Sequence, residues 1–392
     1  MVTVAITGIG VVSAVGRNLE ETLNTFRQGP GSAGTVSVFP TGLPYPVFEV
    51  KHFHRNSPDD ETRTMSLALC AVEEALIDAG MDFQLSGVRV GVCLGTTVGS
   101  QLNDLDFYLK YRRKESVSMR SVDRYLKGNL AEGVRRAIWA RGPSVTVVNA
   151  CSSGADAIGV ALSWLRSGVC DVALAGGADE LNPVPLCGFG SLGILSDLTC
   201  APFDRDRKGL NLGEGAGVLV LESEENSRKR GKEPRLRLAG YGSAADAYHL
   251  TAPRPDGSGL VASLQRAMSE ANVFPGDVSF VNAHGTGTKD NDKVEGAVLK
   301  SIFGKDVKFL STKGFTGHTL GAAGGLEAAF TAAALREGWI PASAGFVNED
   351  DEIRMSPVRQ QTSIARRFAI STSLAFGGNN AALVIGCCQE AC

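Results

Sequence analysis

One cysteine stands at a junction where a thiol could act as a nucleophile. Residues 145–162, VTVVNACSSGADAIGVAL, form an apolar run that ends at Cys151 and continues as an alanine-rich helix pattern. At a helix start, unpaired backbone N–H groups lower the pKa of a thiol and can receive an oxyanion. A structural core cysteine is the alternative interpretation, because free cysteines are among the most buried residues.

Two histidines and a lysine follow apolar strand patterns in the second half. NAHGTGT (282–288) places His284 in a glycine and threonine turn, and STKGFTGHTLGAAGG (311–325) places Lys313 and His318 in another. Ligands collect at the strand ends of doubly wound sheets, so the thiol, both imidazoles and the ammonium could share one cleft. Singly, each histidine could be a core residue and the lysine a solvated charge. Ligands at metal-site spacing are missing, so we expect no metal.

The elements that must position these residues alternate between strand and helix. Short β-rich runs at 88–100, 145–154 and 171–180 end in small or polar residues, and helical stretches such as 64–80 separate them. This alternation predicts a mostly parallel sheet covered by helices on both faces.

The second half repeats the plan of the first half. Four segments match earlier ones in order and type: 235–243 matches 2–10, 278–287 matches 88–97, 307–335 matches 145–165, and 379–386 matches 215–223. We therefore predict two duplicated α/β halves, 1–234 and 235–392, joined by the charged and exposed segment 223–234. The small residues after Cys151 and His318 predict two helices buried between sheets.

The composition excludes several classes of protein. The net charge of -3 over 392 residues gives no reason to expect nucleic acid or an anionic membrane as a partner. Every apolar run is interrupted before about 18 residues, so we expect no transmembrane helix. The start, MVTVAITGIG, predicts a strand and not a signal peptide. Nine scattered cysteines without a C-x-x-C spacing indicate a reducing cytoplasm.

Together, these motifs resemble the β-ketoacyl-[acyl carrier protein] synthases, the elongating (type II) class of the thiolase superfamily. The resemblance covers nearly the whole chain. The matching segments are VAITGIGVVSAVG (4–16), NACSSG (149–154), PFDRDRKGLNLGEGAGVLVLE (202–222), DAYHLTAP (246–253), HGTGT (284–288), STKGFTGHTLGAAGGLEA (311–328) and FGGNN (376–380). The resemblance implies a layered α-β-α-β-α sandwich.

The resemblance also implies a role for each matching catalytic residue. Cys151 matches the nucleophile that carries the acyl chain as a thioester, and His284 and His318 match the pair that drives decarboxylation. Lys313 and Glu327 match the charged residues that order the second histidine. We expect Lys313 to lie beside His318 and to keep that imidazole neutral.

The substrate-binding residues follow from the same match. Phe376 matches the gating phenylalanine, whose N–H completes an oxyanion hole with that of Cys151, and Gly377 follows it in the binding loop. Thr286 and Thr288 match residues that hydrogen-bond the pantetheine arm.

The implied reaction is a decarboxylative Claisen condensation of malonyl carrier protein with the acyl chain on Cys151. It needs no metal or dissociable cofactor, because the pantetheine arrives on the acyl carrier protein. Arg205 and Arg207 are candidate docking charges for that acidic partner, with an ordinary solvated loop as the alternative. The enzyme is expected to form a homodimer, or a heterodimer with a homologous chain-length partner that lacks the cysteine.

Some positions depart from the family pattern. Ala375, in LAFGGNN (374–380), replaces a usual glycine, and KDN (289–291) replaces a segment that usually carries Pro and Gly. Residues 101–138, expected to shape the acyl pocket and the subunit interface, also diverge. We therefore expect a specialised synthase of fatty acid, polyketide or polyene elongation. Thiolases, initiating synthases, non-catalytic partner subunits and a Cys/His hydrolase are the rival classes.

Overall fold

The computed structural model describes residues 2–29, 31–51, 53, 62–85, 87–97, 99, 105–120, 122–123, 129–365 and 367–388. The first half contains β1 (Val4–Ser13), α1 (Leu19–Gln28), α2 (Arg63–Ala79), β2 (Val90–Gly95), α3 (Leu105–Arg112), α5 (Leu130–Ala137), β3 (Ser144–Val147), α6 (Ser153–Arg166), β4 (Val172–Asp179), α7 (Pro183–Ser191), β5 (Gly215–Ser223) and α8 (Glu224–Lys229). The second half contains β6 (Leu236–Ala245), α9 (Ser258–Ala271), β7 (Val278–Asn282), α10 (Lys289–Phe303), β8 (Phe309–Leu310), α11 (Lys313–Thr316), α12 (Ala323–Glu337), β9 (Trp339–Ile340), β10 (Thr362–Ser363), β11 (Phe368–Ala375) and β12 (Asn379–Cys387).

Within the described ranges, ten strands form one sheet in the order β3-β2-β4-β5-β1-β6-β12-β11-β7-β8. From the centre outward, the two halves have the same strand arrangement, and the segments matched in sequence occupy equivalent places. β1 and β6 join the halves by antiparallel pairing, with Val4 opposite Leu238 and Ile6 opposite Leu236. The predicted duplication of an α/β unit is therefore visible in the topology.

The expected mostly parallel sheet was wrong. Parallel pairing is confined to the outer strands, where β2 lies between β3 and β4 and β7 lies between β8 and β11. The central pairs are antiparallel, from β4–β5 through β12–β11. One reason is local: only residues 376–378 separate β11 from β12, and so short a connection forces a hairpin.

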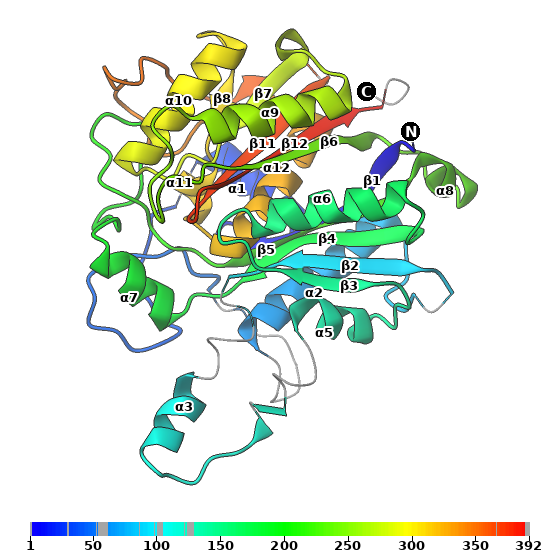
Figure 1. Ribbon diagram of the computed structural model, residues 1–392, viewed down its shortest axis with the longest axis horizontal. Helices are drawn as coiled ribbons and strands as arrows, with labels where there is room; N and C mark the ends of the chain where they lie inside the picture. Colours follow the sequence, from blue (N-terminus) through cyan, green and yellow to red (C-terminus); the bar gives the residue numbers. More distant parts are fainter. Residues whose placement is uncertain are drawn as a thin grey trace.

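Helices α6 and α12 form the middle layer, as Figure 1 shows, with the two halves of the sheet on opposite sides of them. Helix α2 covers the outer face of one half and α9 that of the other. The chain therefore has the five layers, in the order α-β-α-β-α, that the family resemblance implies. None of the helices in the described part of the chain is long and apolar enough to cross a membrane.

The middle layer requires small residues because its backbones approach closely. A Cβ atom on Gly154 of α6 would lie 2.6 Å from the backbone nitrogen of Gly325 in α12, and no side chain could move aside to relieve that contact. A Cβ on Gly325 would in turn lie 2.6 Å from the backbone of Gly177 in β4. The glycine and alanine pattern thus fixes how deeply both helices sit between the sheet halves.

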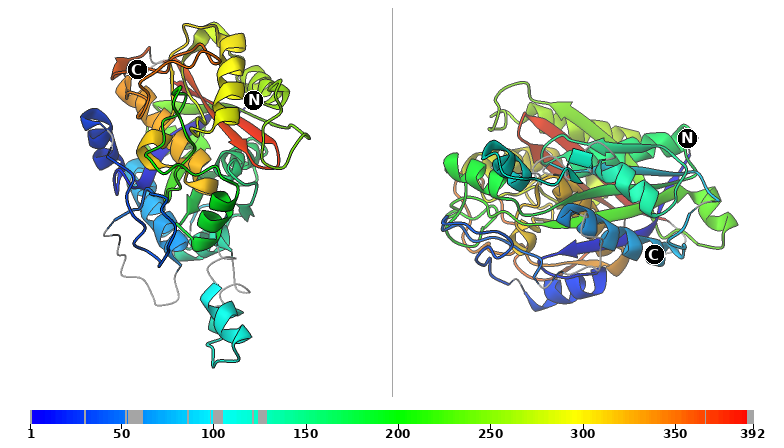
Figure 2. Two further views of the ribbon diagram at one scale, coloured as in Figure 1. Left: turned by 90° about the vertical axis from the view of Figure 1, so that its left-hand side faces the viewer. Right: turned by 90° about the horizontal axis from the view of Figure 1, so that it is seen from below.

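Helix α3 projects from the body of the molecule (Figures 1 and 2). Its Tyr108 and Tyr111 are 53% and 64% exposed. The predicted pocket and interface segment, 101–138, includes this helix, but its residues 101–104, 121 and 124–128 lie outside the described residues.

Candidate active site

Cys151 lies between the end of β3 and the start of α6. Ala150, the residue before it, has a φ of +48°, and this left-handed residue turns the chain sharply into the helix. The Cys151 side chain is only 5% exposed, and Sγ is 3.1 Å from Nε2 of His318. The backbone N–H of Phe376 also donates to this sulfur.

His318 follows α11 and the tight turn at Gly317. Its backbone N–H donates to the carbonyl of Asn211 at 2.8 Å, which anchors the turn to the first half of the chain. The backbone N–H of Leu320 donates to His318 Nδ1 at 3.3 Å. Because Nδ1 accepts a hydrogen bond, this network places the ring proton on Nε2, which faces Cys151.

His284 follows β7 and is 1% exposed. Its backbone N–H donates to the carboxylate of Glu295 at 2.8 Å and to Thr372 Oγ1 at 3.2 Å. Its ring lies edge-on to that of His318, with centroids 5.2 Å apart. Potential ligand atoms of Cys151, His284 and His318 all lie within 4.8 Å of one another.

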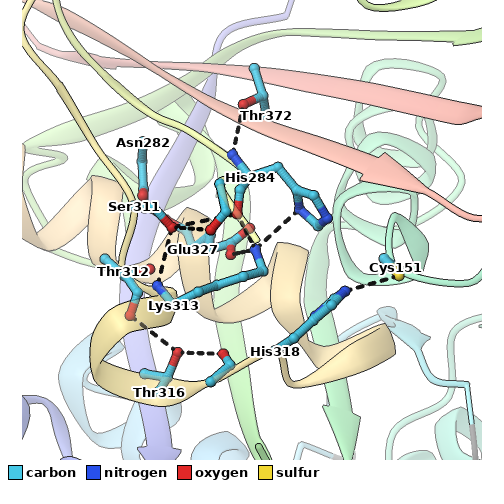
Figure 3. Close-up of polar contacts among 12 residues, drawn as sticks. Cys151, Asn282, His284, Ser311, Thr312, Lys313, Thr316, His318, Glu327 and Thr372 are labelled. Carbon is cyan, nitrogen blue, oxygen red and sulfur yellow. Dashed lines mark hydrogen bonds and ion pairs between the residues drawn. The ribbon is translucent and has the colours of Figure 1, made fainter. Parts of the chain in front are cut away.

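Lys313 and Glu327 form a fully buried ion pair beside His284, as Figure 3 shows. Lys313 Nζ is 3.1 Å from His284 Nδ1 and 2.7 Å from the His284 carbonyl oxygen. The expectation that Lys313 contacts His318 was wrong, because the side chain reaches back toward the end of β7. An ammonium can only donate, so His284 Nδ1 accepts and its Nε2 also carries the proton.

Both imidazoles are neutral at physiological pH. Burial, followed by the charge of Lys313, holds the pKa of His284 and of His318 well below the usual range. The cluster therefore presents two Nε2–H donors to the same space. Such donors suit an oxygen that gains negative charge, whereas a metal ion would need the same nitrogens without their protons.

Burial raises the pKa of the carboxyl and thiol groups, whereas it lowers the pKa of the imidazoles. Burial raises the pKa of Glu327 to about 7, although the charge of Lys313 and its hydrogen bond oppose this shift. Burial likewise raises the pKa of Cys151 to about 11, with the Phe376 N–H and the Lys313 charge acting against it. The expected lowering of the thiol pKa was therefore wrong for this enclosed resting state, because complete desolvation outweighs the nearby donors.

A cavity of about 370 Å³ leads to the cluster. Cys151, His284 and His318 lie along it with Thr286, Thr288 and Phe376, so these six predicted residues share one pocket. Thr286 Oγ1 and Thr288 Oγ1 are 2.8 Å apart. Both hydroxyl groups therefore lie along the route to the thiol, where they can hydrogen-bond a ligand.

Phe376 belongs to the tight turn between β11 and β12. Its ring stacks on Phe189 of α7, with centroids 5.4 Å apart and planes at 12°. The turn obtains its left-handed residues from Gly377 and Gly378, at φ +87° and +78°. Gly377 itself is exposed and does not line the pocket, contrary to the expectation, because its N–H donates to the Leu250 carbonyl at 2.7 Å.

The two proposed docking arginines differ. Arg205 is half exposed and lies 3.7 Å from Asp206. Arg207 is only 5% exposed; it pairs with Asp350 and donates to the carbonyl of Lys289 at 3.1 Å. The prediction that Arg207 docks the carrier protein was therefore wrong, because its buried guanidinium connects two loops through Asp350 and the Lys289 carbonyl.

Several residues that support the site were not predicted from the sequence. Glu295 holds the backbone N–H groups of His284 and Gly285, each at 2.8 Å. Asp292, one helical turn earlier in α10, holds those of Phe203 and Gly287. Two carboxylates three residues apart on a helix share one face, so their spacing was a usable sequence feature. The Phe189 stacking had no comparable pattern.

A buried thiol clustered with two proton-bearing imidazoles, set in a duplicated five-layer α/β sandwich, defines a thiolase-like condensing enzyme. The family model of the β-ketoacyl synthase N-terminal domain matches residues 48–227, and that of the C-terminal domain matches residues 236–347. The chain belongs to the β-ketoacyl synthase family and to its elongating, type II class. It is accordingly an acyltransferase that forms carbon–carbon bonds.

Known relatives support both fatty acid and polyketide associations. The chain is 34% identical to 3-oxoacyl-[acyl-carrier-protein] synthase 2 of Staphylococcus aureus (strain MRSA252), over 98% of each chain. It is similar to the ishigamide ketosynthase/chain length factor, with a TM-score of 0.92 and 31% identity over 98% of this chain and 99% of that one. It is also similar to a type II PKS ketosynthase solved with its acyl-carrier protein, AntDE:AntF, with a TM-score of 0.89 and 26% identity over 99% and 100%.

Proposed function

We propose that Cys151 carries an acyl chain as a thioester while His284 and His318 promote decarboxylation of a malonyl thioester. The observation that carries this proposal is the convergence of Cys151 Sγ with two Nε2–H donors at the end of one pocket. In each ring, the other nitrogen, Nδ1, accepts a hydrogen bond, and this fixes the proton on Nε2. This arrangement supplies a nucleophile and a site for a developing oxyanion within one enclosed volume.

The first half-reaction is acyl transfer. The carbonyl oxygen of the incoming thioester lies between the backbone N–H groups of Cys151 and Phe376, and Sγ attacks the carbonyl carbon. The carbon–sulfur bond to the pantetheine breaks, and the leaving thiolate takes the proton that Cys151 gives up. The high pKa of the resting thiol is thereby no obstacle, because the proton moves as the new bond forms.

The second half-reaction uses both histidines. Malonyl thioester places its carbonyl oxygen between the Nε2–H groups of His284 and His318. Loss of carbon dioxide leaves an enolate, whose charge on that oxygen the two donors stabilise. Its carbon then attacks the acyl-Cys151 carbonyl, the tetrahedral oxyanion collapses, and the carbon–sulfur bond to Cys151 breaks. The released Cys151 thiolate takes one proton from solvent, because the first half-reaction gave its own proton to the pantetheine thiol.

The pantetheine arm of the substrate indicates that the partner is an acyl carrier protein. Thr286 and Thr288 lie where they can hydrogen-bond a pantetheine arm, and an acyl carrier protein would hold that arm at the pocket mouth. Arg205, which is half exposed, remains a candidate docking charge for the carrier protein. We propose no dissociable cofactor, because every reacting group is supplied by the chain or by the carrier-bound substrate.

The edge strand β3 indicates a second subunit. Val145 and Val148, on and just after this strand, are 40% and 60% exposed. Exposed β-branched residues along an unpaired strand edge favour pairing with another chain. We infer a dimer at this edge, with a second copy or with a homologous chain-length partner such as the one named in the ishigamide structure.

Light scattering tests the dimer. A dimer of identical chains would have twice the 41.1 kDa of one chain, and Val148→Glu should shift it toward monomer. A wild-type protein that is monomeric alone and dimeric only with a homologous partner would assign the chain to a heterodimeric polyketide or polyene system. A monomer under both conditions would contradict the proposed interface.

Intact-mass measurement tests the nucleophile. Wild-type protein incubated with acyl carrier protein bearing a labelled acyl group should gain one acyl mass, and Cys151→Ala should gain none. Cys93→Ala, which removes another buried thiol that is not among the residues lining the pocket, should behave as wild type. An equal adduct on Cys151→Ala would refute the assignment, as would undiminished carbon dioxide release by the double variant His284→Ala, His318→Ala.

A further inference from the structure

A second polar cluster lies directly behind the loop of Cys151, and the half-reactions above do not use it. Asp156, in the first turn of α6, is only 6% exposed. Its carboxylate accepts hydrogen bonds from Asn149 Nδ2, from Ser152 Oγ at 2.8 Å and from Tyr241 OH at 2.7 Å. All three donors are neutral, so they offset only part of the cost of burying a carboxylate.

Two of these donors flank the nucleophile in the sequence. Asn149 and Ser152 enclose Ala150 and Cys151, and one oxygen of Asp156 accepts from both flanking side chains. Ala150 occupies the left-handed region at φ +48°. A non-glycine residue keeps such a conformation only where its surroundings enforce it. The carboxylate supplies part of that enforcement.

The third donor comes from the other half of the chain. Tyr241 lies on β6, and its ring packs against α6 at Gly159, where a Cβ atom would lie 2.5 Å from a ring carbon. Burial, followed by the charge of Asp156, raises the pKa of Tyr241, so the phenol stays protonated and donates. Asp156 thereby links the Cys151 loop to the half of the fold that carries both histidines.

We propose that Asp156 is a positioning residue for the acyl-transfer step. Anchored to Tyr241, its carboxylate holds the 149–152 loop so that Cys151 Sγ stays aligned with His318 and with the oxyanion donors. This inference rests on the proposed function, because it requires Cys151 to be the acylated residue. Asp156 touches neither the reacting sulfur nor the pocket lining; it acts through the backbone of the loop.

Replacing the carboxylate by an amide should therefore slow one half-reaction only. In Asp156→Asn, the negative charge is lost and one acceptor oxygen becomes an NH₂ group, so at least one of the three donors loses its acceptor. A displacement of the nucleophile by about 1 Å can cost about 10²-fold in rate. We expect acylation of Cys151 to slow by about that factor, while histidine-dependent decarboxylation of malonyl carrier protein stays near the wild-type rate.

The experiment measures both half-reactions in single-turnover format, acylation by intact mass and decarboxylation by carbon dioxide release. Tyr241→Phe removes one hydrogen bond and leaves the ring, so acylation should slow by about tenfold. Asp78→Asn is the matched control: this carboxylate on α2 also accepts from neighbouring elements, including the Ile9 N–H at 2.9 Å, but lies away from the pocket lining. Both of its half-reactions should match wild type.

Three outcomes would overturn the positioning role. In the first, Asp156→Asn acylates at the wild-type rate; in the second, Asp156→Asn slows both half-reactions equally, which marks a merely structural residue. If Asp156→Asn does not fold, the decision passes to Tyr241→Phe, and unchanged acylation there is the third. An acyl adduct on Cys151→Ala, measured in parallel, would instead refute the proposed function, so the two failures are distinguishable.

Discussion

Replacing Lys313 by methionine separates what this side chain does for stability from what it does for chemistry. Methionine keeps an apolar side chain of similar length and removes the ammonium. Three contacts are lost together: the ion pair with Glu327, the donor that holds His284 Nδ1 at 3.1 Å, and the hydrogen bond to the His284 carbonyl oxygen at 2.7 Å. The first contact concerns folding, and the second concerns which ring nitrogen of His284 faces the substrate with a proton.

The stability effect follows from burial. Both partners are at most 3% exposed, and removing one partner of a buried pair costs about 3–5 kcal/mol. With an unfolding entropy of about 2.1 cal/mol/K per residue over this chain, the melting temperature should fall by about 4–6 K. Adding Glu327→Leu should restore most of that loss, because an apolar pair of similar size is often as stable as the buried ion pair.

The catalytic effect should not be restored by the second substitution. Without Lys313, His284 no longer has its Nε2–H fixed toward the pocket, and loss of one oxyanion donor costs about 10²–10³-fold in rate. Decarboxylation of malonyl carrier protein should fall by that factor in both Lys313→Met and the double variant. Acylation of Cys151 should change far less, because its neighbour is His318.

Scanning calorimetry measures the stability effect of each variant, and carbon dioxide release measures its catalytic effect. Decarboxylation that returns along with stability in the double variant would refute the catalytic role of Lys313, since the ammonium would then serve folding alone. Decarboxylation by folded Lys313→Met within about tenfold of the wild-type rate would refute that role equally.

Two further predictions concern the arginines and the thiol. Arg207→Ala should lower the free energy of unfolding by about 3–5 kcal/mol, because it leaves Asp350 without its buried partner, whereas Arg205→Ala should leave the melting temperature unchanged and raise the KM for the carrier protein. Steady-state kinetics and thermal unfolding check both, and a stable Arg207→Ala would contradict the buried-pair argument. Because burial raises the pKa of Cys151 to about 11, the rate of its alkylation by iodoacetamide should rise about tenfold per pH unit as the thiolate fraction grows; a plateau near neutral pH would show a lowered pKa instead.

The chemistry of this protein was largely readable from its sequence. Cys151 and His284 each lie at the end of a strand pattern, and His318 lies in a glycine turn shortly after another. Strand ends are determined by local alternation of apolar and turn-forming residues. The glycine and alanine runs after Cys151 and His318 likewise predicted two helices that only a crowded middle layer could accommodate. The order of repeated segments was enough to predict a duplicated fold.

Only the tertiary structure decided which of these residues meet. Cys151 and His318 are 167 positions apart, and Lys313 and His284 are 29 apart. The first contact depends on how β1 and β6 join the two halves, and the second depends on the pairing of β7 with β8; no local pattern records either. For that reason the sequence predicts the wrong histidine as the partner of Lys313, a surface charge at Arg207 and a lowered pKa for the Cys151 thiol. Burial, a property of the whole packed chain, controls the last two and reversed both expectations.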